Sequence, residues 1–558
     1  MRDVAMYLRR LPAYIVSEPP RGQSGVTTGM GGHMTIRFVD SNAEEQADSN
    51  EARSGYDPAI LQELLTRHGA RTTAGPVLDT AERRPTAYRR NALLIDADTW
   101  NVQAKQDAIR TTLKDAGMVA EDAATEIEGA PIRVTVNPDE SGKPVDASKA
   151  LEQLDKAAQD DASELTPETA AEVHPEPLIT TMAGALTLVP WAISVDPVGQ
   201  FGPQPGAYGK VAVKVLAGLP PRPGPRGGRR PVIAVVDTGL VPHPDLDVFE
   251  VNGAPFEDQF ITVAPDIQNA IFSSHRKAPT ACTMRFKDHE ERPSNLLNGT
   301  VDEAFGHGTF IAGIIRQAAP AARVLAIKAV NSDRVGYAGD ALIALHGILN
   351  RVKAAQERPQ DEVKRLGMVD IVSFSAGYYA DTDRWPGTKQ LVKVIDELTA
   401  RGVLVLAAAG NDATDQRFYP AALSTRPVDE GSGPQVIGVG ALNPDGTKSL
   451  FSNEAAWVNC WADGVAVIST YPPQVNGPFN PPGVAKLERW GYDPDNFASG
   501  YAMWSGTSFA TPLVASALAE ELMNVAEEDA DLALTDLDRE STVKRAREAL
   551  ERARARYR

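Results

Sequence analysis

Three segments of the 558-residue chain carry side chains of the types that nucleophilic catalysis by serine requires. Asp237 ends the apolar run VIAVVD, His307 lies between the two glycines of FGHGTF, and Ser508 lies within SGTSFATP. A serine hydroxyl is a weak nucleophile that must lose its proton as it attacks a carbonyl carbon. An imidazole can take that proton when a buried carboxylate fixes its tautomer and stabilises its cation. The three residues therefore suit acyl transfer, provided that the fold brings them together.

Two further features suit the negative charge that develops in such a reaction. In VLVLAAAGNDA, Asn411 directly follows an apolar strand and a glycine, so its amide is available to donate to an oxyanion. Ser508 opens a predicted helix, with Pro512 tolerated in the first turn. The backbone N–H groups and the dipole at a helix N-terminus also favour negative charge.

The elements that must position these residues alternate along the chain from residue 231 to about residue 528. Apolar runs such as VIAVVD, VLAIKAV and VLVLAAAG read as buried strands, and GDALIALHGILNRV and TKQLVKVIDELTARG have helical periodicity. This alternation predicts an α/β fold, with a parallel sheet flanked by helices. Strand ends and helix starts converge at one edge of such a sheet, where distant residues can meet.

The blocks DTG with downstream HPDL, GHGT, AAAGN and GTSFATP resemble the subtilase family of serine peptidases, in that family's order Asp, His, Ser. The resemblance covers roughly residues 231 to 528. It implies a subtilisin-like serine endopeptidase in which Asp237 orients His307, the general base, and Ser508 is the nucleophile. By the same resemblance, Asn411 and the backbone N–H of Ser508 donate to the oxyanion.

The resemblance also points to a segment that binds substrate. SFSAG resembles the edge on which subtilases bind an extended peptide by strand pairing, a mode that takes its affinity from main-chain hydrogen bonds. The chemistry needs no cofactor. Subtilases often bind structural calcium through loop oxygens, but no calcium site can be located here and no metal ligands are predicted. The predicted substrate-binding residues are Ser373, Phe374, Ser375, Ala376 and Gly377.

Two other functions use the same residues. A catalytically silent scaffold would bind extended segments without cleaving them, although it would not need all four chemical residues. A peptide ligase or cyclase would transfer the acyl-enzyme to an amine instead of to water. Product mass separates the last case from hydrolysis, because hydrolysis adds water.

The sequence divides into several segments, and the role of the N-terminal α+β unit stays open between two alternatives. The pattern of strands and helices around residues 91 to 158 indicates a small α+β unit. It is compatible with a pro-domain that is later cleaved, or with a retained regulatory module that binds a protein partner. The lack of a visible secretion signal favours regulation. We expect a largely flexible segment (1–57), the α+β unit (58–160), a linker and lead-in (161–230), the peptidase domain (231–530) and a charged, solvated C-terminal helix (531–558).

Charge and cysteine content limit the partners and the compartment. The formal net charge of −18 and pI near 5.0 argue against nucleic acid and against anionic membranes as partners. Only two cysteines are present, Cys282 and Cys460, which fits a reducing compartment. The run from Leu178 to Ser194 contains Pro190 and is short for a bilayer span, so a buried strand or loop is expected there. We therefore predict a cytoplasmic protein that acts on proteins or peptides.

An insertion from about residue 248 to 303 separates Asp237 from His307 and holds a polar cluster. His275, His289 and the acidic residues Asp288, Glu290 and Glu291 could suggest a metal site. A solvated surface loop is the favoured interpretation, because long polar insertions usually lie on the surface.

Overall fold

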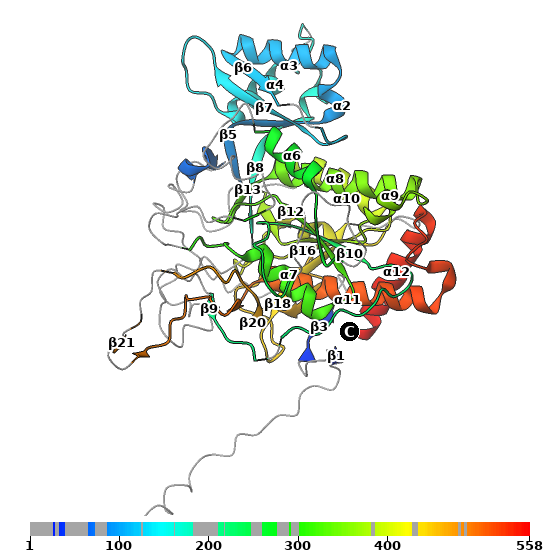
Figure 1. Cartoon of the computed structure of the whole chain (residues 1–558). Coiled ribbons are helices and arrows are strands. Elements are labelled where there is room, and N and C mark those ends of the chain that lie inside the picture. The colour runs from blue at the N-terminus through cyan, green and yellow to red at the C-terminus, as the bar shows by residue number, and fades with distance from the viewer. Residues whose placement is uncertain are drawn as a thin grey trace, which may run out of the picture.

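The central feature of the computed structural model is an eight-stranded sheet in the order β11-β12-β10-β14-β16-β18-β19-β3 (Figure 1). Its first seven strands are parallel, and only β3 runs antiparallel to its neighbour. The predicted parallel α/β sheet is thus confirmed. The strands are β11 (Ile261–Val263), β12 (Arg323–Lys328), β10 (Val232–Asp237), β14 (Ile371–Phe374), β16 (Leu404–Ala408), β18 (Ile437–Leu442), β19 (Cys460–Asp463) and β3 (Ile36–Phe38).

The residues that the structure describes are 26–27, 33–39, 65–72, 86–123, 126–160, 162–181, 210–216, 218–246, 259–275, 290–291, 301–380, 386–426, 433–477, 481, 483–484 and 488–558. Cys282, Asp288 and His289 lie outside them, as does most of the segment 1–57.

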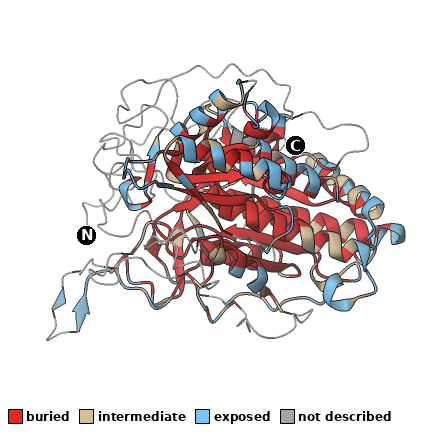
Figure 2. Cartoon of the chain, turned by 90° about the horizontal axis from the view of Figure 1, so that it is seen from above, coloured by how far each residue is buried: buried red, intermediate tan, exposed pale blue. Residues whose placement is uncertain are grey.

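Helices cover both faces of the central sheet because its strands alternate between two cores. In β10, Val232, Ala234 and Val236 join one apolar cluster, and Ile233 and Val235 join the other. The first cluster lies under α6 (Pro265–Ser273), α8 (Ala338–Glu357) and α10 (Pro386–Thr399), and the second lies under α7 (His307–Ala318) and α11 (Thr507–Glu528). Figure 2 shows the buried interior between these layers.

The C-terminal helix α12 (Arg539–Arg556) is an integral part of the second layer. It packs against α11 and buries one face, including Ala546, Ala549 and Leu550. The expectation of a solvated helix therefore holds only for its outer face. Its small apolar residues recur at helical spacing among the charges, which is the pattern of an amphipathic helix.

The N-terminal unit is a second, smaller α+β body that lies on the α6, α8 and α10 side of the central sheet (Figure 1). Its antiparallel sheet has the order β8-β5-β7-β6, and α3 and α4 cover one face around a third apolar cluster. Asp146 caps α4 by accepting a hydrogen bond from the Ser148 N–H at 3.1 Å. Its elements are β4 (Ala70–Thr72), β5 (Ala87–Ile95), α2 (Ala97–Trp100), α3 (Gln103–Asp115), β6 (Met118–Asp122), β7 (Ile132–Pro138), α4 (Ala147–Ala157), α5 (Pro167–Ala170) and β8 (Val173–Thr181).

Two strands depart from the predicted segment boundaries. β8 lies in the segment expected to be a linker, because Pro175 and Pro177 in VHPEPLITT argue against a strand. β3, from the segment expected to be flexible, pairs with β19 at the edge of the central sheet. In each case the partner strand is distant in sequence, so the pairing supplies a stability that the local composition does not reveal.

Short elements complete the described part of the chain. Among the described residues, no helix is long and apolar enough to span a bilayer. Within the run from Leu178 to Ser194, residues 178–181 belong to β8 and the others lie outside the described residues. The remaining elements are β1 (Val26–Thr27), β2 (His33–Met34), β9 (Val211–Ala212), β13 (Val335–Tyr337), α9 (Glu362–Leu366), β15 (Ala376–Tyr379), β17 (Phe418–Tyr419), β20 (Val467–Thr470), β21 (Gly483–Val484), β22 (Arg489–Trp490), β23 (Tyr501–Trp504) and 3₁₀ helices at Ala421–Thr425 and Ala530–Leu532.

Candidate active site

Asp237 and His307 meet at the carboxyl end of the central strand β10. Asp237 is the last residue of β10 and His307 the first of α7, and Oδ1 of Asp237 lies 2.7 Å from Nδ1 of His307. Both side chains are buried, with 1% and 0% exposure. The Asp237 carboxylate also accepts the Thr238 N–H at 2.7 Å, which fixes its orientation. This contact has the geometry that sets an imidazole's tautomer.

Glycines allow the two catalytic segments to approach this closely. A Cβ atom on Gly308 would collide with the carbonyl oxygen of Gly239, two residues beyond Asp237. Gly306 has φ +83°, a left-handed conformation that glycine adopts without steric cost. The glycines around His307 are thus required by backbone proximity.

Ser508 lies beside His307, in the first turn of α11. The next residue, Phe509, packs on the His307 ring with a centroid distance of 5.3 Å, and Trp504 meets the ring edge-on at 5.6 Å. The Ser508 hydroxyl donates to the Ser375 carbonyl oxygen at 3.3 Å, and Nε2 of His307 has no hydrogen-bond partner among the described residues. The Ser508–His307 hydrogen bond expected of a triad is therefore not formed here. Such contacts often tighten only when substrate binds.

Asn411 lies at the same edge, after β16. Its Oδ1 accepts two hydrogen bonds from Thr507, from the backbone N–H at 2.9 Å and from the hydroxyl at 2.8 Å. Because the amide oxygen is held by the residue before Ser508, the donor end of the amide is directed away from Thr507. Thr507 thus links Asn411 to the start of α11, a connection that the sequence analysis did not anticipate.

The predicted substrate-binding segment divides into an interior part and an edge part. Ser373 and Phe374 lie within β14, whose two sides pair with β10 and β16, so they cannot pair with an added strand. Ser375 joins β14 to β15 and contacts Ser508. Only Ala376 and Gly377, at the start of β15, lie where an added strand can pair. In this structure β8 of the N-terminal unit occupies that edge and pairs with both residues in antiparallel orientation.

A second edge, formed by β13, lies on the other side of β8 from β15 and was not predicted from the sequence. The strand β13 pairs antiparallel with β8, with Val335 opposite Thr180 and Tyr337 opposite Leu178. The end of β8 thus lies between β13 and β15. The signal that could have revealed this edge is Gly336 between Val335 and Tyr337, since a strand glycine often marks close backbone approach.

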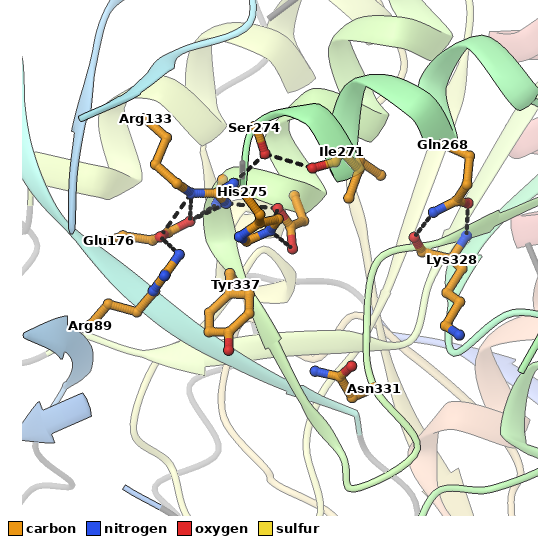
Figure 3. A network of polar contacts seen from close by, with 12 residues as sticks. Arg89, Arg133, Glu176, Gln268, Ile271, Ser274, His275, Lys328, Asn331 and Tyr337 are labelled. Atoms are coloured by element: carbon orange, nitrogen blue, oxygen red, sulfur yellow. Dashed lines mark hydrogen bonds and ion pairs between the residues drawn. The ribbon is translucent and has the colours of Figure 1, made fainter. Parts of the chain in front are cut away.

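A buried ionic cluster joins the N-terminal unit to the peptidase unit (Figure 3). Arg133 of β7 contacts Glu176 of β8 and also Asp340 of α8, the latter at 2.7 Å. His275 lies 2.8 Å from Asp340, and Arg89 lies 3.0 Å from Glu176. Burial alone would lower the pKa of Arg133, but the carboxylates of Glu176 and Asp340 raise it above its ordinary value. The charges of the cluster are therefore paired with one another although the side chains are buried.

The expectation of a solvated loop is wrong for most of the described part of the insertion, which forms β11 of the central sheet and the partly buried helix α6. Two of its charged or titratable residues are buried as well. His275 and Glu291 are 2% and 5% exposed, His275 within the ionic cluster and Glu291 behind His307. Buried partners such as Asp340 and Gly306 lie far away in sequence, so local polarity suggested the wrong environment. Within the described ranges, no group of three or more His, Cys, Asp or Glu residues is arranged to hold a metal ion.

The unit that carries this site is similar in sequence to known proteins. The model of the subtilase family of peptidases matches residues 228–545. The chain is 29% identical to an intracellular serine protease of Paenibacillus polymyxa (52% of this chain, 66% of that protein). It is 26% identical both to serine protease AprX of Bacillus subtilis (52% and 56%) and to subtilisin BL of Lederbergia lenta (51% and 74%). The matches thus span about half of this chain and less than two thirds of AprX. Since the family model covers more than half of its residues, the chain belongs to the subtilase family.

Proposed function

We propose that this chain is a serine endopeptidase that hydrolyses proteins or peptides through an acyl-enzyme on Ser508. The observation that carries the proposal is the buried 2.7 Å contact between Asp237 and His307, with Ser508 at the adjoining helix start. A strand end and two helix starts thereby present an acid, a base and a nucleophile at one sheet edge. No cofactor is needed for this chemistry, and no calcium site is assigned.

In the proposed mechanism, His307 takes the Ser508 proton as the hydroxyl attacks the substrate carbonyl carbon. The oxyanion accepts hydrogen bonds from the Asn411 amide and the Ser508 backbone N–H, which helix α11 presents at its positive end. His307 then protonates the leaving amine and activates water to hydrolyse the acyl-enzyme. Asp237 keeps the imidazole in the required tautomer throughout.

The proposal includes control by the N-terminal unit. The end of β8 pairs with both β13 and β15, which are the edges that an extended substrate would use. A substrate strand cannot pair there while β8 is in place. The N-terminal unit therefore acts as an inhibitor within the same chain, and a regulatory protein partner would act by displacing it.

We also propose the cytoplasm as the site of action. Only two cysteines are present in 558 residues, which suits a reducing compartment. One similar protein is named an intracellular serine protease.

Covalent labelling tests the proposed nucleophile. A fluorophosphonate is expected to modify the full chain slowly and the chain after limited proteolysis rapidly, with the mass increase on the peptide containing Ser508. The Ser508→Ala variant should stay unmodified. Ser516→Ala, which removes another buried hydroxyl of α11, should label like the wild type. Absence of label from both forms of the wild type would overturn the proposed function.

Acid pH is expected to release the N-terminal unit. Burial lowers the pKa of His174 in β8 and of His346 in α8 to about 4, and it also lowers that of His275. His346 faces Gly129 of the N-terminal unit, with its Nδ1 3.1 Å from where a Cβ would stand. In the separated units these histidines would titrate near their ordinary value of about 6.5. The released state thus binds more protons, so docking is at full strength above pH 6.5 and weakens as the pH falls toward 4.

Hydrogen exchange of β8 in the Ser508→Ala chain, measured from pH 8 to pH 4.5, checks this expectation. Exchange corrected for its intrinsic pH dependence should accelerate below pH 6.5 in the parent chain. The double variant His174→Gln, His346→Gln should show a shallower dependence, and His243→Gln, within the peptidase unit, should match the parent. Constant protection of β8 over this range would contradict the prediction.

A further inference from the structure

Glu291 connects the two backbone segments that carry Asp237 and His307. Its backbone N–H donates to the Leu240 carbonyl oxygen at 3.0 Å, three residues after Asp237. Its Oε2 accepts the Gly306 N–H at 2.8 Å, directly before His307. We infer that Glu291 is a positioning residue, which holds Gly306, and through it His307, against Asp237. The inference rests on the proposed function.

Side chains from two other segments cap the start of α7, with Thr238 in place of an N-cap side chain and Glu291 in place of the capping-box glutamate. Gly306 is the N-cap residue of α7 and has no side chain with which to cap the helix. In a capping box, a Glu of the first helical turn accepts the N–H of the N-cap residue. Here Glu291 accepts that N–H from a distant segment, and the Thr238 hydroxyl accepts the Gly308 N–H at 3.1 Å. The start of α7 is thus fixed from both sides of His307.

The environment of Glu291 favours the neutral acid. Burial raises the pKa of Glu291 well above its usual range, and the Asp237 carboxylate raises it further. The Gly306 N–H and the Lys328 ammonium group offset only part of that increase. The raised pKa lessens the negative charge that Glu291 places beside Asp237, and the Gly306 hydrogen bond needs only a carboxyl oxygen as its acceptor.

Other titratable groups around Glu291 come from separate elements. Burial lowers the pKa of Lys210, next to β9, to about 7, although Glu291 acts in the opposite direction. Burial also raises the pKa of Tyr471, after β20, and Glu291 adds to that increase. Lys328 ends β12, opposite Asp237 in the sheet register. Because these groups also titrate, only variants of Glu291 itself assign an ionisation to it.

A comparison of Glu291→Gln with Glu291→Ala tests the inference. Glutamine keeps a neutral acceptor for the Gly306 N–H, and alanine removes it. We expect Glu291→Ala to lower kcat by about 10²-fold with little change in KM, the scale of a displacement of about 1 Å in a reacting group. Glu291→Gln should retain kcat at pH 7, because it keeps the acceptor for the Gly306 N–H. Asp361→Ala, which removes the N-cap of α9, is the matched control and should leave kcat unchanged.

A spectroscopic readout separates this inference from the proposed function. In the Ser508→Ala background, the His307 Nδ1–H bonded to Asp237 should give a downfield proton resonance. Glu291→Ala should weaken or broaden it, and Glu291→Gln and Asp361→Ala should preserve it. An unchanged resonance in Glu291→Ala, or equal losses in all three variants, would overturn the positioning role whether or not the chain cleaves peptides. If Glu291→Ala does not fold, Glu291→Met, which fills a similar volume without an acceptor, takes its place, and loss of the resonance supports the role while preservation overturns it.

Discussion

Replacing His307 or Ser508 with alanine is expected to lower kcat by about 10⁶-fold, and replacing both is expected to cost no more than either alone. The magnitude is taken from subtilisin, for which this loss was measured. The physical reason is that a base without a nucleophile, or a nucleophile without a base, performs no part of the step. The rate that remains comes from substrate binding and from the oxyanion donors.

Replacing Asp237 is expected to lower kcat less than replacing His307 or Ser508. Asp237→Asn should lower kcat by roughly 10⁴-fold, because the amide favours the wrong imidazole tautomer while leaving the nucleophile and base in place. Steady-state kinetics on a chromogenic peptide measure kcat for all of these variants. Limited proteolysis first removes the N-terminal unit from the substrate-binding edges. Near-ultraviolet circular dichroism establishes that each is folded. Multiplicative losses in the His307→Ala, Ser508→Ala double variant would show that the two residues do not act as one unit.

Removing the cation of the buried ionic cluster should release the N-terminal unit. Arg133→Met leaves Glu176 and Asp340 buried without their shared partner, and breaking such a pair typically costs about 3 to 5 kcal/mol. Docking of the unit would then weaken by about 10² to 10³-fold, since each 1.4 kcal/mol is a factor of ten. Initial hydrolysis by the full chain should rise accordingly, because β8 would leave the edges formed by β13 and β15 more often.

Two variants control for non-specific effects of removing an arginine. Arg71→Met removes an ion pair between half-exposed Arg71 and buried Asp146 and should leave docking unchanged, because both residues belong to the N-terminal unit. Adding only Asp340→Asn to Arg133→Met should restore part of the docking, since Glu176 keeps Arg89 as its partner and no carboxylate is left unpaired. Protection of β8 from hydrogen exchange in the Ser508→Ala background gives the docking change directly. Equal protection in Arg133→Met and the parent would rule out the cluster as the latch.

Much of the candidate site could be predicted because its signals are local. Asp237 and Asn411 follow continuous apolar runs, and such runs in an alternating chain become parallel strands whose ends share one edge. His307 and Ser508 each precede an apolar helical stretch, so the sequence places them at helix starts. Each inference needs only about a dozen neighbouring residues.

The rest required partners that lie far away in the chain. Pro175 and Pro177 weaken a strand locally, and β8 forms because β5, β13 and β15 supply its hydrogen bonds. Arg133 lies in β7, and only the docking of the two units buries it against Asp340. Polarity alone therefore predicted exposure where the tertiary structure provides buried partners.

Periodicity and short motifs act over neighbouring residues, and they were enough to predict the fold class, the family and the four candidate chemical residues. The place of β8 between two edges beside Ser508, the burial of Arg133 among carboxylates and the contact of Glu291 with Gly306 became visible only in the folded chain. Burial and hydrogen bonding between distant segments depend on how whole elements pack. No local pattern encodes which buried group a polar side chain will meet.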